Sequence, residues 1–583
     1  MKELKYLNKY LIKYKYRLGF GILITILSKI LAIQIPSFIK NSLNIVEDYN
    51  KGLITDITEV KSTLTINILL IIGAALLSGF FTFLMRQTII VMSRYIEFDL
   101  KNEIFKQYEN LSINFYKKNR TGDLMNRISE DVGNVRMYVG PAIMYTMNML
   151  VLFAVALTKM ISIDATLTLY TLLPLPILSF SIYTLSKVIN KRSSKVQEYL
   201  SKLTTLAQET FSGVHVIKAY AIEPQTIKNF DALAVKSKDK NLSLYKAQAL
   251  FFPLMILLIG VSNILVIYIG GMRYISGEIT NIGVIAEFII YINMLTWPVA
   301  VVGWVTSMVQ QAEASQKRIN EFLHEKPAVA NSNSKPSTIK GDIAFNNVSF
   351  TYEDTNIKAL KNVNFKIKHG QTLAIMGKTG SGKSTIVSLI ARLYNVTDGN
   401  ILIDNDLITA INLNSLRSQI GFVPQDSFLF SETIEDNIRF GKHNASQSEV
   451  ENAAINANVH NNITSFKNGY KTMVGERGVT LSGGQKQRIS IARAIIGSPK
   501  ILIFDDCLSA VDTKTEEIIL NNLKTVSKNI TTLIISHRIS TVKNADQIIV
   551  LDKGQLIQNG THQELKNQKG YYKNIYEQQM ENI

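Results

Sequence analysis

A glycine-rich stretch of the chain reads Gly377-Lys378-Thr379-Gly380-Ser381-Gly382-Lys383-Ser384. An apolar run, 372–376, comes before it, and a second run, 385–390, comes after it. This order predicts a strand, a loop and a helix. It matches the phosphate-binding pattern G-x-x-x-x-G-K-[ST] in the structural context that the pattern requires. A chance glycine-rich turn would not be expected to have that context.

Each part of this loop has a physical role in holding a triphosphate. The glycines allow successive backbone N–H groups to point inward, and the helix that starts near Lys383 adds its positive end. The Lys383 ammonium can reach the terminal phosphates, and the Ser384 hydroxyl is placed to ligate Mg²⁺. The sequence therefore predicts a nucleotide triphosphate site with Mg²⁺.

The composition indicates a membrane part joined to a soluble part. Hydrophobic residues make up 46% of the 583 residues, 19% are charged, and the mean hydropathy is +0.11. The net charge of +17 is compatible with a nucleic-acid partner, but the basic residues cluster beside apolar segments, which favours membrane charge. The single cysteine, Cys507, excludes an intrachain disulfide.

Six long apolar segments precede the glycine-rich loop. They lie near 18–44, 64–92, 137–161, 165–189, 248–272 and 282–309. Each exceeds the ~20 residues needed to cross a bilayer. The connections 93–136 and 190–247 are long and rich in Lys and Arg, so the positive-inside rule places them in the cytoplasm, with the N-terminus and everything after 310.

The two long connections are expected to be helical hairpins. With about 20 residues per arm, such a hairpin reaches ~30 Å from the membrane. Each has a break near its middle, at 115–123 and at 220–224, where a short transverse helix could dock on a cytoplasmic domain. A plain solvated hairpin is the alternative, but long connections are usually functional.

The predicted architecture has several domains. An all-α transmembrane domain with six spans and two long cytoplasmic loops occupies 1–324. A linker rich in Asn, Ser and Pro follows at 325–340. From 341 to 583, short apolar strands alternate with helical patterns, as expected of an α/β phosphate-loop domain.

Further candidate residues flank the loop in sequence. Thr385 extends the loop into the following helix. Tyr352 follows an apolar strand, where an aromatic ring can stack on adenine, although a tyrosine at a sheet edge would look the same. Gln425 follows a strand and a proline, where its amide can contact Mg²⁺ or water.

Polar residues also open one helix and end two strands. Ser482-Gly483-Gly484-Gln485 starts a helix and leaves N–H groups for an anion, or Ser482 is an ordinary cap. Asp505 and Asp506 end the apolar strand 501–504; Asp505 is placed to hold Mg²⁺ and Asp506 to face the attacking water, the alternative being simple solvation. His537 ends the strand 532–536 and can bond the terminal phosphate, although alone it would pass for a surface histidine.

The order of these motifs resembles the ATP-binding cassette of ABC transporters. By that resemblance Tyr352 is the A-loop, 377–385 the Walker A motif, Gln425 the Q-loop, 472–478 the X-loop, 481–485 the signature motif, Asp505 the Walker B aspartate, 509–512 the D-loop and His537 the switch histidine. The six-span domain is similar to exporter half-transporters of the multidrug and lipid-flippase type. The resemblance covers essentially the whole chain.

The resemblance implies a dimer in which each ATP lies between the Walker A loop of one chain and the signature motif of the other. This chain departs from the family at Asp506, where Glu is usual. In exporters built from two different chains one chain often carries such a change, so a homologous half-transporter is favoured as partner over a second copy. The expected activity is ATP-driven efflux of a drug or lipid, with ATP-gated channel or regulator, and import through the same fold, as alternatives.

Two features of the spans bear on the transported compound. Lys29 lies within the first span and Glu287 near the start of the last, and charges inside a membrane are functional candidates unless they reach an interface. Trp297 and Trp304 are seven residues apart and share one face of the last span. That face is predicted either to line the substrate pathway or to anchor the helix in lipid.

Overall fold

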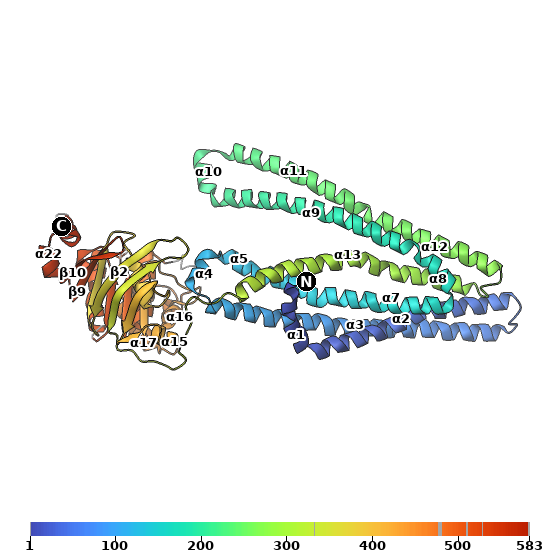
Figure 1. Cartoon of the computed structure of the whole chain (residues 1–583), viewed down its shortest axis with the longest axis horizontal. Coiled ribbons are helices and arrows are strands. Elements are labelled where there is room, and N and C mark those ends of the chain that lie inside the picture. Colours follow the sequence, from blue (N-terminus) through green and yellow to red (C-terminus); the bar gives the residue numbers. More distant parts are fainter. Residues whose placement is uncertain (1, 332, 476–480, 509–510, 527–528, 581–583) are drawn as a thin grey trace. The chain divides into compact units, whose positions relative to one another are not determined.

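The chain forms two compact units (Figure 1). The computed structural model describes residues 2–331, 333–475, 481–508, 511–526 and 529–580. The first unit comprises Met1–Gln107 and Gly122–His324, and the second comprises Tyr108–Thr121 and Glu325–Ile583. A short piece of the first long connection therefore belongs with the C-terminal unit.

The first unit is built from helices. Its long helices are α2 (Lys15–Asn50), α3 (Ile57–Asn110), α7 (Ile143–Ile163), α9 (Pro174–Ser212), α11 (Glu223–Ala249), α12 (Phe251–Ile275) and α13 (Gly283–Leu323). Shorter helices and turns are η1 (Glu3–Leu7), α1 (Asn8–Lys13), α5 (Thr121–Asn126), η2 (Arg127–Asp131), α6 (Val132–Met137), η3 (Tyr138–Ala142), α8 (Ala165–Leu172) and α10 (Val214–Tyr220). The expected helical membrane domain is confirmed.

Within the described residues, five helical stretches are long and apolar enough to cross a membrane. They are Lys15–Asn50, Ile57–Asn110, Thr121–Ile163, Glu223–Ile275 and Gly283–Leu323. The remaining predicted segment, 165–189, is the fourth in the chain; it forms α8 and the start of α9 and is divided at Leu173. Leu173 keeps helical backbone angles, but Pro174 and Pro176 lack the N–H groups that an uninterrupted helix would use.

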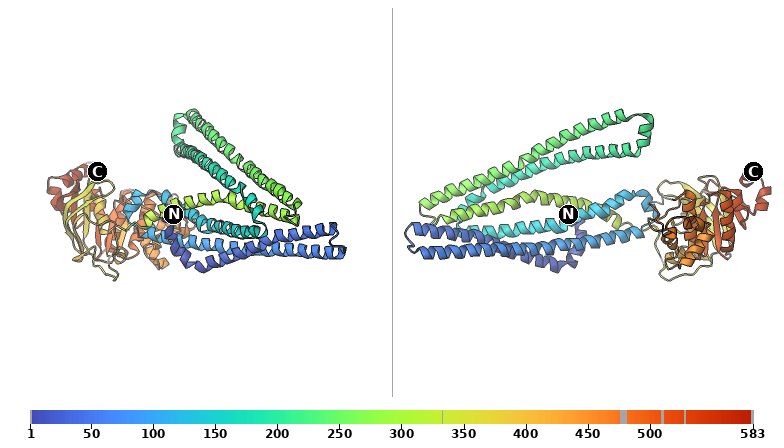
Figure 2. Two further views of the ribbon diagram at one scale, coloured as in Figure 1. Left: turned by 45° about the vertical axis from the view of Figure 1, so that its right-hand side comes forward. Right: turned by 180° about the vertical axis from the view of Figure 1, so that it is seen from behind.

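Both long connections are helical, as expected, with a break near the middle. Helices α9 and α11 run side by side and are joined by the short helix α10, which Figure 2 shows at the tip of the hairpin. The first connection continues α3 as far as Asn110 and then turns into the short helix α4 (Ile113–Lys118). Helix α10 has no buried residue in this chain.

The basic N-terminal segment is fixed to α3 by polar contacts. The Lys9 ammonium and the Tyr6 hydroxyl each lie 2.6 Å from the Glu103 carboxylate, and the Lys13 ammonium lies 2.6 Å from Asp99. Tyr10 also donates to Glu103. The short N-terminal helix is thus held against the C-terminal part of α3, beyond the apolar part of that helix.

The second unit contains two sheets. The first has the order β2-β1-β4-β5, and the second has the order β10-β9-β3-β8-β7-β6. The strands are β1 (Ile343–Thr351), β2 (Lys358–Ile367), β3 (Thr372–Gly377), β4 (Asp398–Ile403), β5 (Asp406–Leu407), β6 (Ile420–Val423), β7 (Ile501–Asp505), β8 (Thr531–Ile535), β9 (Gln547–Asp552) and β10 (Gln555–Gly560). Strand pairing is parallel between β3, β6, β7, β8 and β9 where they adjoin, and antiparallel between β9 and β10.

The described helices between and after these strands are α14 (Lys383–Ile390), α15 (Leu413–Ser418), α16 (Ile434–Arg439), α17 (Gln447–Asn456), α18 (His460–Thr464), α19 (Gly483–Ile495), α20 (Thr513–Val526), α21 (Ile539–Val542), α22 (His562–Asn567) and α23 (Tyr571–Met580), with the turn η4 (Gly469–Lys471). Helices α14, α15 and α19 contact strands of the parallel sheet. Strands β7 and β8 are buried along their whole length, which explains their continuous apolar sequence. The carboxyl ends of β3, β6, β7 and β8 consequently meet at one edge, where the predicted site residues lie.

Candidate functional site

The glycine-rich loop connects β3 to α14, as its sequence predicts. Gly377 has φ of +145°, Gly380 of +78° and Gly382 of +101°. A Cβ atom at Gly377 would lie 2.2 Å from the Leu551 carbonyl oxygen, and one at Gly382 would lie 2.5 Å from that of Ala359. Both the backbone angles and the space therefore require glycine at these two positions.

Lys383 is held over the loop by its own backbone. Its ammonium donates to the carbonyl oxygens of Gly377 and Lys378, at 2.9 Å each. Burial lowers the Lys383 pKa, and the carboxylates of Asp506 and Asp505 oppose that shift. A buried cation beside a glycine-rich loop at the start of a helix is suited to an anion with several charges.

A cavity of about 640 Å³ lies above this loop and gathers most of the predicted residues. The predicted residues that line it are Tyr352, Thr379, Gly380, Gly382, Lys383, Ser384, Thr385, Gln425, Asp505, Asp506 and His537. Gly377, Lys378 and Ser381 form the back of the loop and are not among its lining residues. The Ser381 hydroxyl is buried without a hydrogen-bond partner among the described residues.

The two carboxylates at the end of β7 differ in their surroundings. The Ser384 hydroxyl donates to Asp505 at 3.0 Å. Burial raises the Asp505 pKa, and the Ser384 hydrogen bond offsets part of this rise. Burial also raises the Asp506 pKa, and the neighbouring His537 and Lys383 offset part of this rise. Asp506 has φ of +46°, a left-handed conformation that Asp adopts more readily than most residues.

His537 lies on the same cavity wall after β8. Burial lowers its pKa, Lys383 lowers it further, and Asp506 opposes the shift. At neutral pH the imidazole is therefore mainly uncharged and has one N–H to donate. Gln425 reaches the same cavity from the end of β6.

The oxygen donors here suit Mg²⁺ better than a transition metal. Ser384 and Asp505 present two oxygens at one point, and Gln425 adds an amide to the same cavity. Among the described residues there is no cluster of three His, Cys, Asp or Glu that could hold a metal ion by itself. Mg²⁺ uses few protein ligands and completes its shell with water and phosphate oxygens. The residues present therefore fit Mg²⁺ bound together with a phosphate.

The Tyr352 side chain also lines the cavity and is held in place by its neighbours. Its hydroxyl lies 3.0 Å from the Thr385 hydroxyl, and its ring meets Phe350 and Tyr394 edge-on. The Lys117 ammonium from α4 lies 4.5 Å from the centre of the Tyr352 ring. Helix α4 thus docks beside Tyr352, which confirms the expected docking for the first long connection.

The segment Ser482–Gln485 begins α19 and does not line this cavity. The Ser482 hydroxyl accepts from the Gln485 N–H, and the Gln485 side chain accepts from the Ser482 N–H. This capping box shows that Ser482 does cap the helix. Gly483 and Gly484 occupy its first turn. In the predicted D-loop, 509–510 lie outside the described residues, as do 476–478 of the predicted X-loop.

Three basic residues that the sequence analysis did not single out also line the cavity. Lys358 and Lys361 come from β2, and Lys553 comes from the turn between β9 and β10. No motif marks them, because they reach the site only through the fold. Cys507, next to Asp506, is buried and has a raised thiol pKa.

Fold and site together define a phosphate-loop ATPase unit joined to a helical membrane unit. The ABC transporter transmembrane region matches residues 18–299, and the ABC transporter model matches residues 360–509. The chain belongs to the ABC transporter family. It therefore binds ATP, it hydrolyses ATP in the service of transport, and it is a membrane protein.

Named relatives are similar along most of the chain. "Multidrug resistance-like ATP-binding protein MdlA" of Escherichia coli (strain K12) is 37% identical over 91% of this chain and 90% of its own length. "Probable multidrug resistance ABC transporter ATP-binding/permease protein YheI" of Bacillus subtilis (strain 168) is 39% identical over 82% of each chain. The solved structure of a bacterial Atm1-family ABC exporter with ATP bound has a TM-score of 0.80 and 26% identity, and the match covers 97% of this chain and 99% of that one.

Proposed function

We propose that the chain is one half of an ATP-driven exporter that moves a hydrophobic or amphipathic compound, a drug or lipid, across the membrane by alternating access. The observation that carries this proposal is the cavity above the glycine-rich loop, in a chain whose other unit spans a membrane. The names of MdlA and YheI, and the exporter fold of the Atm1-family structure, support export. The multi-pass chain is assigned to the cell membrane, with its N-terminus and ATPase unit in the cytoplasm.

Each cavity residue has a role in this proposal. Tyr352 stacks on adenine, the loop 377–385 cradles the phosphates, and Lys383 neutralises their terminal charge. When bound, Mg²⁺ neutralises the β- and γ-phosphate oxygens, and Ser384, Asp505 and Gln425 are the residues that would hold it. Asp506 accepts a proton from the attacking water, and neutral His537 donates a hydrogen bond to the terminal phosphate.

A second half-transporter completes the site. Ser482, Gly483, Gly484 and Gln485 start a helix away from the chain's own cavity, which suits contact with a nucleotide held by another chain. Helix α10 supports the same assembly, because its Val216 and Tyr220 side chains are 56% and 75% exposed and need a partner surface. The partner favoured here is a different, homologous chain, because Asp506 is shorter than the glutamate that the family usually has.

Phosphate release in response to a transported compound tests the proposal. The full chain, with the partner that co-purifies, is placed in vesicles with its ATPase unit outside, and uptake and phosphate release are measured together. An exporter gives uptake into the vesicle lumen that depends on hydrolysis. An ATP-gated channel gives flux in the presence of a non-hydrolysable ATP analogue, and an importer gives ATP-dependent loss from preloaded vesicles.

A further inference from the structure

A second cavity lies within the helical unit, among α2, α3, α7 and α13. Its volume is about 350 Å³, within the lower range for small-molecule sites. Its wall is rich in methionine, with Met85, Met144, Met149 and Met294 among the lining residues, and Trp297 also contributes. Methionine walls adapt to apolar groups of different shapes. The cavity therefore has a surface for an apolar group that need not be of one fixed shape.

Two cations line this cavity, and neither has a counter-charge among the described residues. Lys29 comes from α2 and Arg86 from α3. The structure shows no ion pair and no side-chain hydrogen bond for either residue among the described residues, and the described lining includes no Asp or Glu. The Ser28 hydroxyl lies 2.9 Å from the Thr82 hydroxyl, so α2 and α3 are in contact here. Ser28 is next to Lys29 in α2, and Thr82 is one helical turn before Arg86 in α3.

The buried carboxylate Glu287 of the same unit has a counter-charge, unlike the two cations of the cavity. Glu287, which is fully buried, lies 2.9 Å from the Lys40 ammonium and accepts from Ser37 and Tyr291. Unlike Lys29, it therefore has its partners within the chain. Charges inside a membrane are normally paired or face a pathway, so the unpaired cations of the cavity need an anion from elsewhere.

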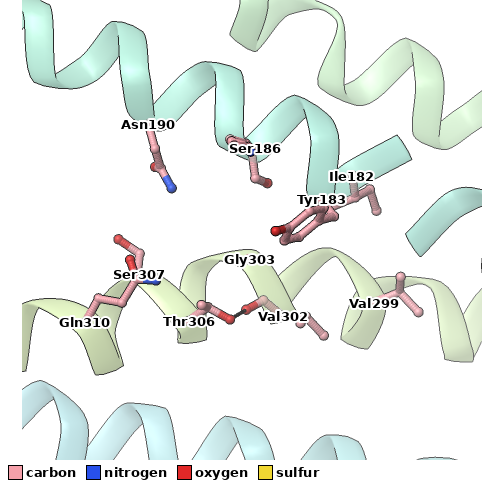
Figure 3. A pocket seen from close by; sticks show the side chains of 11 residues that line it. Ile182, Tyr183, Ser186, Asn190, Val299, Val302, Gly303, Thr306, Ser307 and Gln310 are labelled. Atoms are coloured by element: carbon pink, nitrogen blue, oxygen red, sulfur yellow. Dashed lines mark hydrogen bonds between the residues drawn. The ribbon is translucent and has the colours of Figure 1, made fainter. Parts of the chain in front are cut away.

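A neighbouring cavity of about 300 Å³ between α9 and α13 has the same sign of charge. Figure 3 shows Ser186 and Asn190 of α9 across from Ser307 and Gln310 of α13. Lys187 is the one charged residue in its described lining. Helix α13 borders both cavities; the described lining has two cations in the first and one in the second, and no carboxylate in either. The positive charge in both cavities would attract an acidic group along α13 and would repel a cation.

We propose that the transported compound is an amphipathic anion. Its acidic headgroup is held by Lys29 and Arg86, and its apolar part lies against the methionines and Trp297. The proposal rests on the proposed export function and specifies the substrate class of that function. It separates this chain from an exporter of hydrophobic cations, since a cation would meet two like charges with no carboxylate to compensate for them.

The test compares three probes with the same dodecyl chain below their micellar concentrations. They are dodecanesulfonate, dodecanol and dodecyltrimethylammonium, added to the full chain with its co-purifying partner in phosphatidylcholine nanodiscs. Trp297 lines the cavity, and Trp304, the other tryptophan of the chain, packs against the cavity residue Tyr145 with ring centres 5.3 Å apart. A Trp304→Phe background leaves Trp297 as this chain's reporter, and change in its emission measures binding.

We expect dodecanesulfonate to bind about tenfold more tightly than the other two probes, as one charge-assisted contact would give. The double variant Lys29→Gln and Arg86→Gln should lose this preference, whereas Lys29→Arg should keep it. The matched control is Lys159→Gln, which removes a cation of α7 that lines neither cavity and should change nothing. Replacing phosphatidylcholine by phosphatidylglycerol should suppress the signal if the natural anion is a membrane lipid, and leave it if the anion is a soluble amphiphile.

Equal binding of all three probes, or preference for the ammonium probe, would overturn the proposal. So would a double variant that folds, as judged by its thermal unfolding, and keeps the sulfonate preference, because the cations would then serve only to reach the interface. These results leave export intact if any probe still stimulates phosphate release and is taken up. Absence of uptake for every probe, with ATP hydrolysis present, would instead count against the export function.

Discussion

Lengthening Asp506 by one methylene should speed hydrolysis at the site built on this chain. Asp506 lines the ATP cavity beside Lys383 and His537, where a general base would contact the attacking water. A base must approach within roughly 2.6–3.2 Å of the group from which it takes the proton. One C–C bond is about 1.5 Å, so Asp506 falls short of the position that a glutamate carboxylate reaches by about 1 Å.

The size of the effect follows from that shortfall. A misplacement of about 1 Å can cost about a hundredfold in rate, which corresponds to about 2.7 kcal/mol of activation free energy. Asp506→Glu should therefore raise turnover by up to about a hundredfold. The same change places a less tolerant residue at φ of +46°, which costs roughly 1 kcal/mol of stability and lowers the melting temperature by about 2–4 °C.

Single-turnover hydrolysis separates the chemical step from assembly. The chain and its partner are mixed with less ATP than sites, and phosphate is followed with time for the natural protein and for Asp506→Glu and Asp506→Asn. In a heterodimer, Asp506→Asn should leave most of the activity, because the partner's site carries turnover. In a homodimer it should abolish activity. A clear fall in rate for Asp506→Glu would refute the reasoning, since Asp506 would then already be the working base.

Three further predictions concern the same unit. Lys383→Ala should abolish ATP turnover, because it removes the ammonium from the terminal phosphates; an unchanged rate with the normal partner present would mean that the assignment is wrong or that this chain's own site is dispensable. In the pH profile of kcat/KM, the raised Asp506 pKa should move the acid limb to higher pH than an ordinary aspartate would give, and the lowered Lys383 pKa should move the alkaline limb to lower pH than an ordinary lysine would give. Ser482→Ala should remove the capping box, cost about 1 kcal/mol of stability, and also slow hydrolysis, whereas Ser482→Thr keeps the cap.

The parts of the site that could be predicted are those fixed by local sequence. The loop 377–384 contains its glycines and is flanked in sequence by a strand and a helix, and the structure has each of these features. The acidic pair at 505–506 follows an apolar strand that is buried on both faces. Such features depend on a few neighbouring residues, so one sequence is enough to identify them.

Long-range pairing explains what the sequence could not show. Lys553 reaches the cavity because β9 pairs with β3, far away in sequence, and Lys358 does so from β2 in the other sheet. The split of the fourth apolar segment at Leu173 was also missed, although Pro174 and Pro176 could have signalled it. A charge inside a span is visible in sequence, but only the fold shows that Lys29 shares a cavity with Arg86.

A set of contacts inside the second unit connects the ATP cavity to the first long connection. Lys117 of α4 lies over the Tyr352 ring, the Tyr352 hydroxyl contacts Thr385, and the adjacent Ser384 donates to Asp505. Adenine stacked on Tyr352, and Mg²⁺ held with the phosphates at Ser384, would therefore act on groups that are in contact with α4 or next to residues that are. A ligand can bias a conformational change only through contacts that differ between the two states. Because α4 follows α3 in the chain, a change in this contact set would reach the end of a helix whose earlier part lines the methionine-walled cavity.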